Sequence, residues 1–268
     1  MVHGEFCVGL DVIILAGGFA KRLRPISDVM PKPLLHINGV PLLNHVLEKI
    51  LEIDYNRIII STNKKFEGSF RYWMKTLETV YEKIKIFLSV EPSQSEEEKF
   101  GAVGGLSYTI KLFNVDNSGH DLLVILGDNL FDFDLKGFVS YGARLNRIVI
   151  GAYNVKDPDV AKKYGVIEVD ENRRVTSFLE KPEKPSSTLI SVGIYYVPNR
   201  FIQKIDEFLG LQKYRDAVGK FFEWLSKNTE VYAYEFTGYW ADIGTPESYL
   251  EANRWASERN LGRRWQWP

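Results

Sequence analysis

Residues 12–35 read V-I-I-L-A-G-G-F-A-K-R-L-R-P-I-S-D-V-M-P-K-P-L-L, and this stretch decides the fold class. Residues 12–16 are a short apolar run, rich in β-branched side chains, that ends at a glycine pair. Such a run is typical of a strand buried on both faces of a parallel sheet. Gly17 and Gly18 lack a Cβ, so the backbone can turn there and its N–H groups can approach an anion closely. The stretch therefore predicts a buried strand followed by an anion-binding turn.

Basic side chains follow the glycine pair at fixed positions. Lys21, Arg22 and Arg24 come first, and Lys32 then stands between two prolines that fix the backbone around it. A guanidinium matches phosphate geometry and an ammonium is a compact point charge, so the set suits a nucleotide polyphosphate. A solvated basic loop without a ligand is the alternative, and the combined spacing disfavours it. Neither a P-loop nor a G-x-G-x-x-G motif is present here.

This stretch resembles the N-terminal motif of the sugar-1-phosphate nucleotidyltransferases (NDP-sugar pyrophosphorylases), L-A-G-G-x-G-T-R-L-x-P-x-T-x-x-x-P-K-P-L. The chain departs from it at Ala20, Lys21 and Ser27, where the motif has Gly, Thr and Thr. It is most similar to short-form glucose-1-phosphate thymidylyltransferases and mannose-1-phosphate guanylyltransferases. The resemblance implies that Arg22 and Lys32 stabilise the triphosphate and the leaving pyrophosphate. It implies nucleotide contacts from Leu15, Ala16, Gly17, Gly18 and Lys21.

Apolar patterns along the chain predict alternating strands and helices, which favours an α/β fold with a Rossmann-like, doubly wound, mostly parallel mixed sheet. The resemblance implies the same α/β architecture, in the form known as the nucleotide-diphospho-sugar transferase fold. Ligands of such sheets bind beyond the carboxyl ends of the strands. The predicted strands after the first are 57–61, 84–90, 122–126, 148–155, 165–170, 174–180, 189–197 and 231–236. The predicted helices are 42–53, 70–81, 102–112, 201–209, 216–226 and 246–259.

Composition narrows the class of protein. The 268 residues are 45% hydrophobic and 26% charged, which is enough for one large α/β domain or two small ones. Because the chain ends soon after the last predicted helix, we expect a single domain over 1–268 without room for an appended hexapeptide-repeat β-helix. The net charge of −1 argues against nucleic-acid binding. Cys7 is the only cysteine, so neither an intrachain disulfide nor a thiolate metal site is expected. No apolar run reaches the ~18 residues of a membrane span, and no basic secretory start is present, so we expect a cytoplasmic protein.

Two aspartates are candidate metal ligands. Asp128 follows a predicted strand in L-G-D-N-L, and Asp242 lies in W-A-D-I-G-T. Taken alone, Asp128 is equally typical of a turn. The resemblance implies that both bind Mg²⁺, which on a nucleotide uses one or two carboxylates together with phosphate oxygens and water. Asp132 and Asp134 match no metal spacing and are expected to be turn or surface residues, whereas Thr245 is expected to cap the helix that Pro246 begins.

Sugar recognition is expected on the carboxyl-terminal side of the chain. The resemblance implies that in E-K-P Glu180 accepts hydrogen bonds from sugar hydroxyls and Lys181 binds the sugar phosphate, roles that suit a carboxylate and an ammonium. A charged surface turn is the alternative for this tripeptide. The resemblance assigns sugar-phosphate binding to Tyr164, Gly165, Glu180, Lys181, Gly193 and Trp240. Ser191 replaces an asparagine that the family often carries, which leaves the sugar contacts there open.

The base-recognising turn matches the family less well. G-A-V-G-G-L, which begins at Gly101, stands where the family has G-T-A-G-A-L. Glu91 stands near the place where thymidylyl enzymes carry a base-reading glutamine. Residues 93–99, S-Q-S-E-E-E-K, resemble an insertion that we expect to be mobile and solvated. The choice of base therefore stays open.

The sequence thus predicts a Mg²⁺-dependent enzyme that condenses a nucleoside triphosphate with a sugar 1-phosphate and releases pyrophosphate. The preferred pair is dTTP with glucose 1-phosphate. GTP with mannose 1-phosphate and UTP with glucose 1-phosphate are the alternatives. A catalytically inactive regulatory subunit of the same fold is an alternative of another class, and the presence of all the charged site residues disfavours it. A metal-dependent glycosyltransferase is a third alternative, but it would not need the triphosphate motif. The sequence does not decide whether the protein forms a homo-oligomer.

Overall fold

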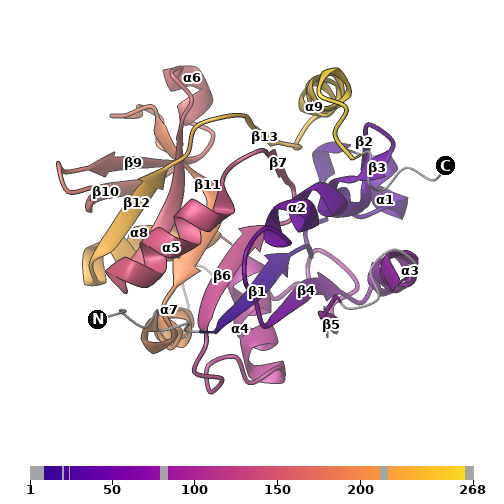
Figure 1. The fold of residues 1–268 in the computed structure, drawn as a ribbon, viewed down its shortest axis with the longest axis horizontal. Coiled ribbons are helices and arrows are strands. Elements are labelled where there is room, and N and C mark those ends of the chain that lie inside the picture. The colour runs from indigo at the N-terminus through magenta and orange to yellow at the C-terminus, as the bar shows by residue number, and fades with distance from the viewer. Residues whose placement is uncertain (1–8, 20, 24, 79–83, 212–216, 263–268) are drawn as a thin grey trace, which may run out of the picture.

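The structure is a computed structural model that describes residues 9–19, 21–23, 25–78, 84–211 and 217–262. Within these residues a nine-stranded sheet runs through the middle of the molecule (Figure 1). Four of its strands are parallel neighbours, because helices connect them across the faces of the sheet. In spatial order they are β5 (Ile86–Glu91), β4 (Arg57–Asn63), β1 (Leu10–Leu15) and β6 (Asp121–Leu126).

The sheet forks at β11 (Leu189–Val197), which pairs antiparallel with three strands. On one edge, residues 194–197 pair with β6, whereas Ile190 pairs with Val166 of another strand. Residues 191–193 lie between these two pairings, and a register shift with a positive φ of 74° at Gly193 marks a bulge. The remaining strands are β8 (Ile148–Asn154), β9 (Gly165–Val169), β10 (Val175–Glu180) and β12 (Val231–Glu235).

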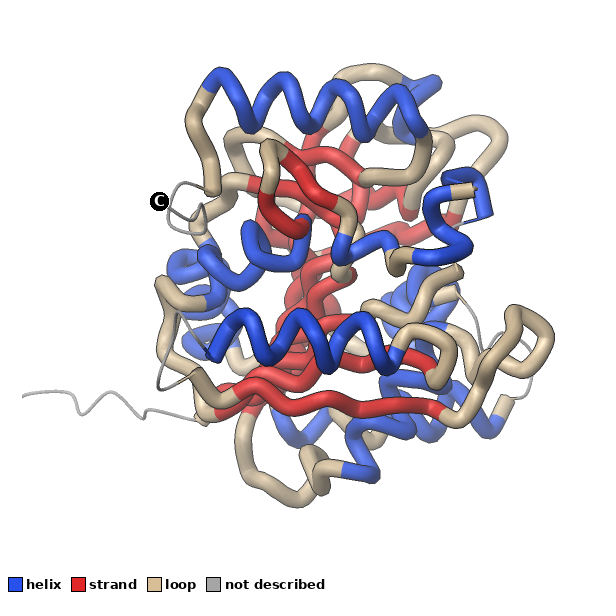
Figure 2. The backbone as a smooth tube through the Cα atoms, turned by 90° about the vertical axis from the view of Figure 1, so that its right-hand side faces the viewer, coloured by secondary structure: helices blue, strands red, loops and turns tan. Residues whose placement is uncertain are grey.

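Helices cover both faces of the sheet. Alternate side chains of β1 enter two separate cores, Val12 and Ile14 on one face and Ile13 on the other. Figure 2 shows helices on both sides of the strands. The first core takes apolar side chains from α2 (Leu42–Ile50), α3 (Glu67–Glu78) and α5 (Leu135–Leu145). The second takes them from α4 (Ala102–Leu112), α7 (Lys204–Gly210) and α8 (Val218–Asn228).

A third, smaller core lies under α9 (Pro246–Glu258). It joins that helix to a hairpin and to a two-stranded sheet, in which β7 (Asn129–Phe131) pairs antiparallel with β13 (Trp240–Asp242). As predicted, Thr245 caps α9 and Pro246 is its first residue. The other short elements are α1 (Ile26–Val29), α6 (Pro158–Ala161), the hairpin β2 (His36–Ile37) and β3 (Val40–Pro41), and 3-10 turns at Lys21–Leu23, Lys32–Leu34 and Asn199–Phe201.

The predicted α/β fold class is confirmed. Helix 102–112 and strand 189–197 have the expected bounds, and most other elements shift by a few residues. Helix α5 was not predicted, although Asp134 caps its start and Asn146 ends it in a left-handed conformation. Residues 79–81 and 216 of two predicted helices, together with Cys7, lie outside the described residues.

Two smaller expectations have opposite outcomes. Asp132 and Asp134 are structural, as predicted, because their carboxylates accept backbone N–H groups of Tyr239 and Gly137. The expectation of a solvated loop over residues 93–99 is wrong at its start, since Ser93 is only 3% exposed and donates a hydrogen bond to the buried Glu91. Among the described residues, no helix combines the length and apolar character that a membrane span needs.

Candidate active site

One large cavity, of about 990 Å³, opens at the carboxyl ends of the parallel strands and beside the fork in the sheet. Every candidate site residue whose side chain is described contributes to its lining. Ala20 and Arg24 lie outside the described residues, and the side chain of Lys21 is not described. The candidates in the lining are Leu15, Ala16, Gly17, Gly18, Arg22, Lys32, Glu91, Gly101, Asp128, Tyr164, Gly165, Glu180, Lys181, Gly193, Trp240 and Asp242.

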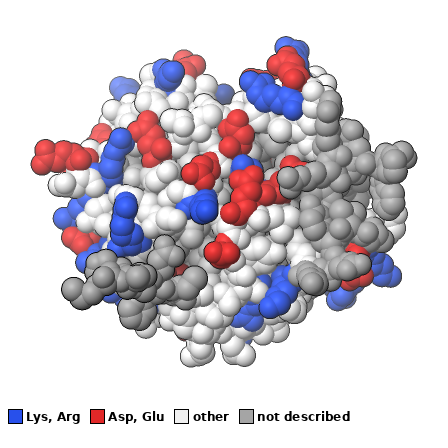
Figure 3. Space-filling model, viewed as in Figure 1, with Lys and Arg blue, Asp and Glu red and all other residues white. Residues whose placement is uncertain are grey.

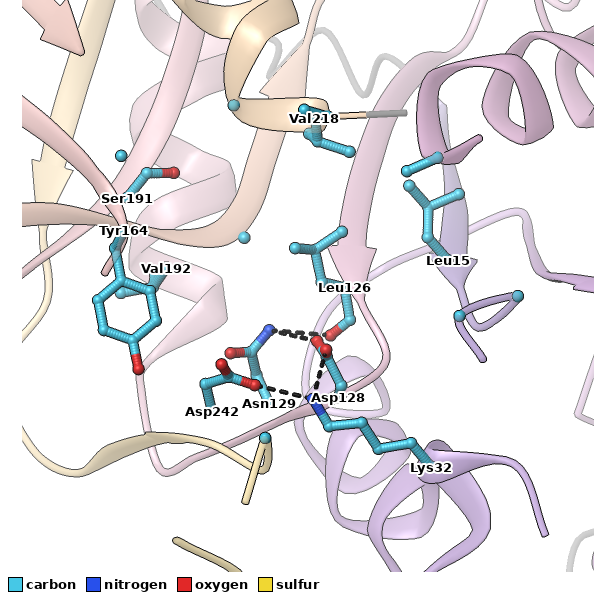
Figure 4. A pocket seen from close by; sticks show the side chains of 18 of the residues that line it. Leu15, Lys32, Leu126, Asp128, Asn129, Tyr164, Ser191, Val192, Val218 and Asp242 are labelled. Atoms are coloured by element: carbon cyan, nitrogen blue, oxygen red, sulfur yellow. Dashed lines mark hydrogen bonds and ion pairs between the residues drawn. The ribbon is translucent and has the colours of Figure 1, made fainter. Parts of the chain in front are cut away.

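Lys32, Asp128 and Asp242 form a charged cluster in this cavity. The Lys32 Nζ lies 2.7 Å from Asp128 Oδ2 and 2.9 Å from Asp242 Oδ1. Figure 4 shows Lys32 pointing at both carboxylates, with Leu15 on one side of the cavity and Tyr164 and Ser191 on the other. The small sheet of β7 and β13 brings the two aspartates together, and Ile243 N donates to Asp128 O at 3.0 Å.

Burial and charge act on this cluster together. Burial alone would lower the pKa of Lys32, but the two carboxylates outweigh it, and the pKa of Lys32 is raised. Burial also raises the pKa of Asp242, and the neighbouring Asp128 adds to that effect, while Lys32 and Arg22 oppose it. Two carboxylates thus share one ammonium, which leaves the cluster of three with a net negative charge. Such a cluster attracts a further cation.

The donor set fits a nucleotide-bound Mg²⁺. Oxygens of both aspartates lie within 3 Å of one point, which the Lys32 ammonium occupies. In the described part of the chain, no group of three or more His, Cys, Asp or Glu side chains could hold a metal by itself. Two carboxylates with substrate phosphates and water are the usual environment of Mg²⁺, whereas a cage built only from protein ligands is not.

The glycine turn after β1 is held by neighbouring strands. Asn63 Nδ2, at the end of β4, donates to Gly17 O at 2.8 Å, and its Oδ1 accepts from Phe66 N. Neither Gly17 nor Gly18 has a positive φ, so these glycines are not required by a left-handed backbone. A Cβ at Gly18 would meet no atom within 4 Å. The turn therefore leaves open space for a ligand, and sequence reasoning missed Asn63.

A buried carboxylate marks the side of the cavity near α4. Glu91 is 7% exposed, and Ser93 Oγ donates to its Oε1 at 2.5 Å. A Cβ at Gly105 would lie 3.2 Å from Glu91 Oε2, closer than nine in ten such contacts. Gly101 precedes α4 with a φ of 77°, a conformation that favours glycine. Gly105 thus provides the space that the Glu91 carboxylate needs.

Glu180 and Lys181 lie at the opposite side of the cavity. The Glu180 side chain is 13% exposed, and its Oε1 lies 3.5 Å from Lys181 Nζ. Lys181 has a left-handed φ of 50° and is held there by a hydrogen bond from its N to Tyr164 O. A non-glycine residue in this region is uncommon. Gly219, at the start of α8, packs against the Glu180 carboxylate and was not among the predicted residues.

An aromatic wall adjoins the aspartates. The rings of Tyr164 and Trp240 meet edge to face, 5.0 Å apart. Burial, followed by the Asp242 charge, raises the pKa of Tyr164 to about 12, so its hydroxyl stays protonated and can donate. Asn129, also missed from the sequence, accepts from Trp240 Nε1 at 3.1 Å and donates to Asp128 Oδ1 at 3.3 Å. Asn129 thus links the aromatic wall to the charged cluster.

Gly193 is required where β11 bulges. Its φ of 74° favours glycine, and a Cβ would lie 2.7 Å from Leu126 side-chain atoms. The bulge places residues 191–193 in the cavity lining.

The surface of the molecule carries mixed charge. Figure 3 shows acidic and basic side chains over the described part of one face, without a continuous basic surface.

Comparison with known proteins identifies relatives of this chain. The family model described as "Nucleotidyl transferase" matches residues 11–259. The bifunctional protein GlmU of Methanocaldococcus jannaschii is 29% identical over 250 residues, which are 93% of this chain and 55% of that protein. A Sulfolobus acidocaldarius protein assigned as a mannose-1-phosphate guanyltransferase is 31% identical over 245 residues, 91% of this chain and 62% of that protein. The chain thus spans little more than half the length of these curated relatives.

A solved structure is similar over nearly the whole chain. The Bacillus anthracis protein assigned as a glucose-1-phosphate thymidylyltransferase, crystallised with sucrose, has a TM-score of 0.80 and 26% sequence identity. The match covers 96% of this chain and 98% of that one.

Proposed function

The chain belongs to the nucleotidyl transferase family, and from this we propose that it joins a nucleoside triphosphate to a sugar 1-phosphate and releases pyrophosphate. One observation carries the proposal. The Lys32, Asp128 and Asp242 cluster lies in one cavity of about 990 Å³, between the glycine turn and the residues Glu180 and Lys181. A site for two anionic substrates needs cations and a metal-binding pair of carboxylates between them.

The glycine turn and the basic residues would bind the triphosphate. Gly17 and Gly18 leave space for the phosphates, and Arg22 lines the same cavity. Lys32 would pair with the phosphates and offset the charge that develops on the leaving pyrophosphate. Removing one such preorganised contact typically costs about 10²- to 10³-fold in turnover.

The other side of the cavity would bind the sugar 1-phosphate. The Glu180 carboxylate would accept hydrogen bonds from sugar hydroxyls, and Lys181 would pair with the phosphate. The Tyr164 hydroxyl would donate to the sugar, because a pKa of about 12 keeps it protonated. Trp240 would pack against the ring, in an orientation that Asn129 fixes.

The proposed reaction needs no residue that acts as a general base. A phosphate monoester loses its second proton at a pH of about 6, so its oxygen is already anionic near neutral pH. That oxygen would attack the α-phosphorus in line, and the bond to the pyrophosphate would break. Asp128 and Asp242 would hold Mg²⁺, which when bound neutralises charge on phosphate oxygens. The remaining catalytic contribution is the alignment of two anions that would otherwise repel each other.

The pair dTTP and glucose 1-phosphate remains our first proposal for the substrates, and the buried Glu91 favours one competitor. A carboxylate accepts hydrogen bonds only, and guanine offers two adjacent donors on its Watson–Crick edge, N1–H and N2–H₂. Thymine and uracil offer one donor between two acceptors. Because Glu91 is buried near α4 in the cavity wall, GTP with mannose 1-phosphate is the second candidate.

A substrate matrix tests the proposal. We would incubate the protein with each of dTTP, UTP, GTP, CTP and ATP, combined with each of several sugar 1-phosphates and MgCl₂. Mass spectrometry would then identify any NDP-sugar. We expect one nucleotide and a small group of sugars to dominate. An absence of NDP-sugar for every pair, from folded protein, would overturn the proposed function and favour an inactive regulatory subunit.

A further inference from the structure

We propose that Lys32 takes the place of the divalent cation in the substrate-free protein, and that metal and Lys32 compete for Asp128 and Asp242. This inference rests on the proposed function, since the triphosphate would be the second partner of Lys32. It concerns a different property, namely how the site controls its own charge before substrates arrive.

The geometry points to competition for one position. The Lys32 Nζ contacts Asp128 at 2.7 Å and Asp242 at 2.9 Å, so it lies between the two carboxylates. A metal bound by both carboxylates would need the same space. The Lys32 side chain is only 10% exposed and the Asp242 side chain 22%, so the contact between them is poorly screened by solvent, whereas the Asp128 side chain is 37% exposed.

The ammonium is also held in this position by its backbone. Lys32 begins a 3-10 turn after Pro31, which has a φ of −64°, and Pro33 follows it. Leu35 N donates to Lys32 O at 3.1 Å. Lys32 thus has an ordered backbone, while its four-carbon side chain can redirect the charge by bond rotation alone.

The consequence is a coupling between the two ligands. A triphosphate that draws Lys32 toward its oxygens would remove the ammonium from both aspartates, and the metal affinity would then rise. By thermodynamic linkage, a bound metal would raise the triphosphate affinity by the same factor. The free protein would bind Mg²⁺ weakly, and metal and nucleotide would enter together.

Metal binding without substrates tests this inference. Mn²⁺ alone would be titrated, with detection by electron paramagnetic resonance, into the wild type, Lys32→Met, Lys32→Arg and Lys163→Met. Lys163 is a matched control, because it is an exposed lysine in the cavity lining with no ion pair to either aspartate. We expect Lys32→Met to bind Mn²⁺ at least about tenfold more tightly than the wild type. Lys32→Arg and Lys163→Met should stay close to the wild type.

The inference is wrong if Lys32→Met binds Mn²⁺ as weakly as the wild type, or more weakly. Should that variant fail to fold, amine labelling of the wild type gives an independent result. Adding Mg²⁺ alone should increase acylation of Lys32, measured by mass spectrometry, and leave Lys163 unchanged. Unchanged labelling of Lys32 at saturating Mg²⁺ would also overturn the inference. Neither test uses turnover, so a failure here is distinguishable from a failure of the proposed function.

Discussion

The Glu180 carboxylate occupies the space beside Gly219 that any other side chain would fill. A Cβ at Gly219 would lie 1.8 Å from Glu180 Oε2 and 2.4 Å from its Cδ. The two residues come from β10 and from the start of α8, which pack against each other. The absence of a side chain on one element therefore sets the position of a proposed sugar-binding carboxylate on another.

Gly219→Ala should displace the Glu180 carboxylate and leave the fold intact, because the clash falls on the end of a flexible side chain. We expect the KM for sugar 1-phosphate to rise by about 10- to 100-fold, the range for losing a charged hydrogen bond. The KM for nucleotide should stay within a factor of two or so. Steady-state kinetics with each substrate varied would show this split. Gly68→Ala is the control, since a Cβ there meets no atom within 4 Å in α3. Equal effects on both KM values would contradict the assignment of Glu180.

Asp242→Asn should reduce turnover by about 10²- to 10³-fold without destabilising the protein. Burial and the Asp128 charge both disfavour the ionised carboxylate, so its removal relieves repulsion while Lys32 keeps one partner. Thermal unfolding should occur at the wild-type temperature or above it. Asp134→Asn is the control, because it lies outside the cavity and asparagine also caps helices well. Wild-type turnover in Asp242→Asn would exclude this residue from the site.

Glu91→Gln should change the choice of base. If guanine is read by the carboxylate, the amide retains one acceptor and gains donors, so discrimination for GTP over dTTP should fall by about 10-fold or more. The measurement is kcat/KM for both nucleotides with the same sugar 1-phosphate. Should Glu91→Gln leave the ratio unchanged, Glu91 has only a structural role through Ser93 and Gly105.

The stability of the protein should fall below pH 6.5, partly through His45. Burial lowers the pKa of His45, and its Nε2 donates to Ile37 O at 3.1 Å in the neutral form. The unfolded chain therefore binds a proton at His45 before the folded protein does, and unfolding is favoured as the pH falls from 6.5 toward the lowered pKa. Urea midpoints at pH 7.5 and 5 should differ less in His45→Gln than in the wild type. His36→Gln, at an exposed histidine, should keep the full difference.

The sequence predicted the long strands of the nine-stranded sheet to within a few residues, but not the pairing that makes the sheet fork. Residues 12–16, 58–60 and 122–126 are continuous apolar runs, which are typical of buried parallel strands. The fork at β11 left no comparable signal, because it depends on a bulge and on pairing between distant strands. Helix α5 was missed although Asp134 and Asn146 are good caps, since Gly137 and Gly142 weaken its helical pattern.

The same division applies to the candidate site. Residues that carry charge into the cavity, such as Lys32 and Asp242, stand in motifs with fixed spacing and were predicted. Residues that act by supporting others were not. Asn129 and Asn63 hold their neighbours through tertiary hydrogen bonds, and Gly219 acts through the space it leaves. No local pattern indicates such a role, because the partner lies on another element.

The most direct test of the account is the dependence of pyrophosphate release on the sugar 1-phosphate. Purified protein would be mixed with NTP and Mg²⁺, with and without the sugar 1-phosphate, and pyrophosphate and NDP-sugar would be measured together. We expect release only when both substrates are present, one NDP-sugar for each pyrophosphate, and a loss of both products in Asp128→Asn. Pyrophosphate formed without the sugar 1-phosphate, or undiminished in Asp128→Asn, would contradict this expectation.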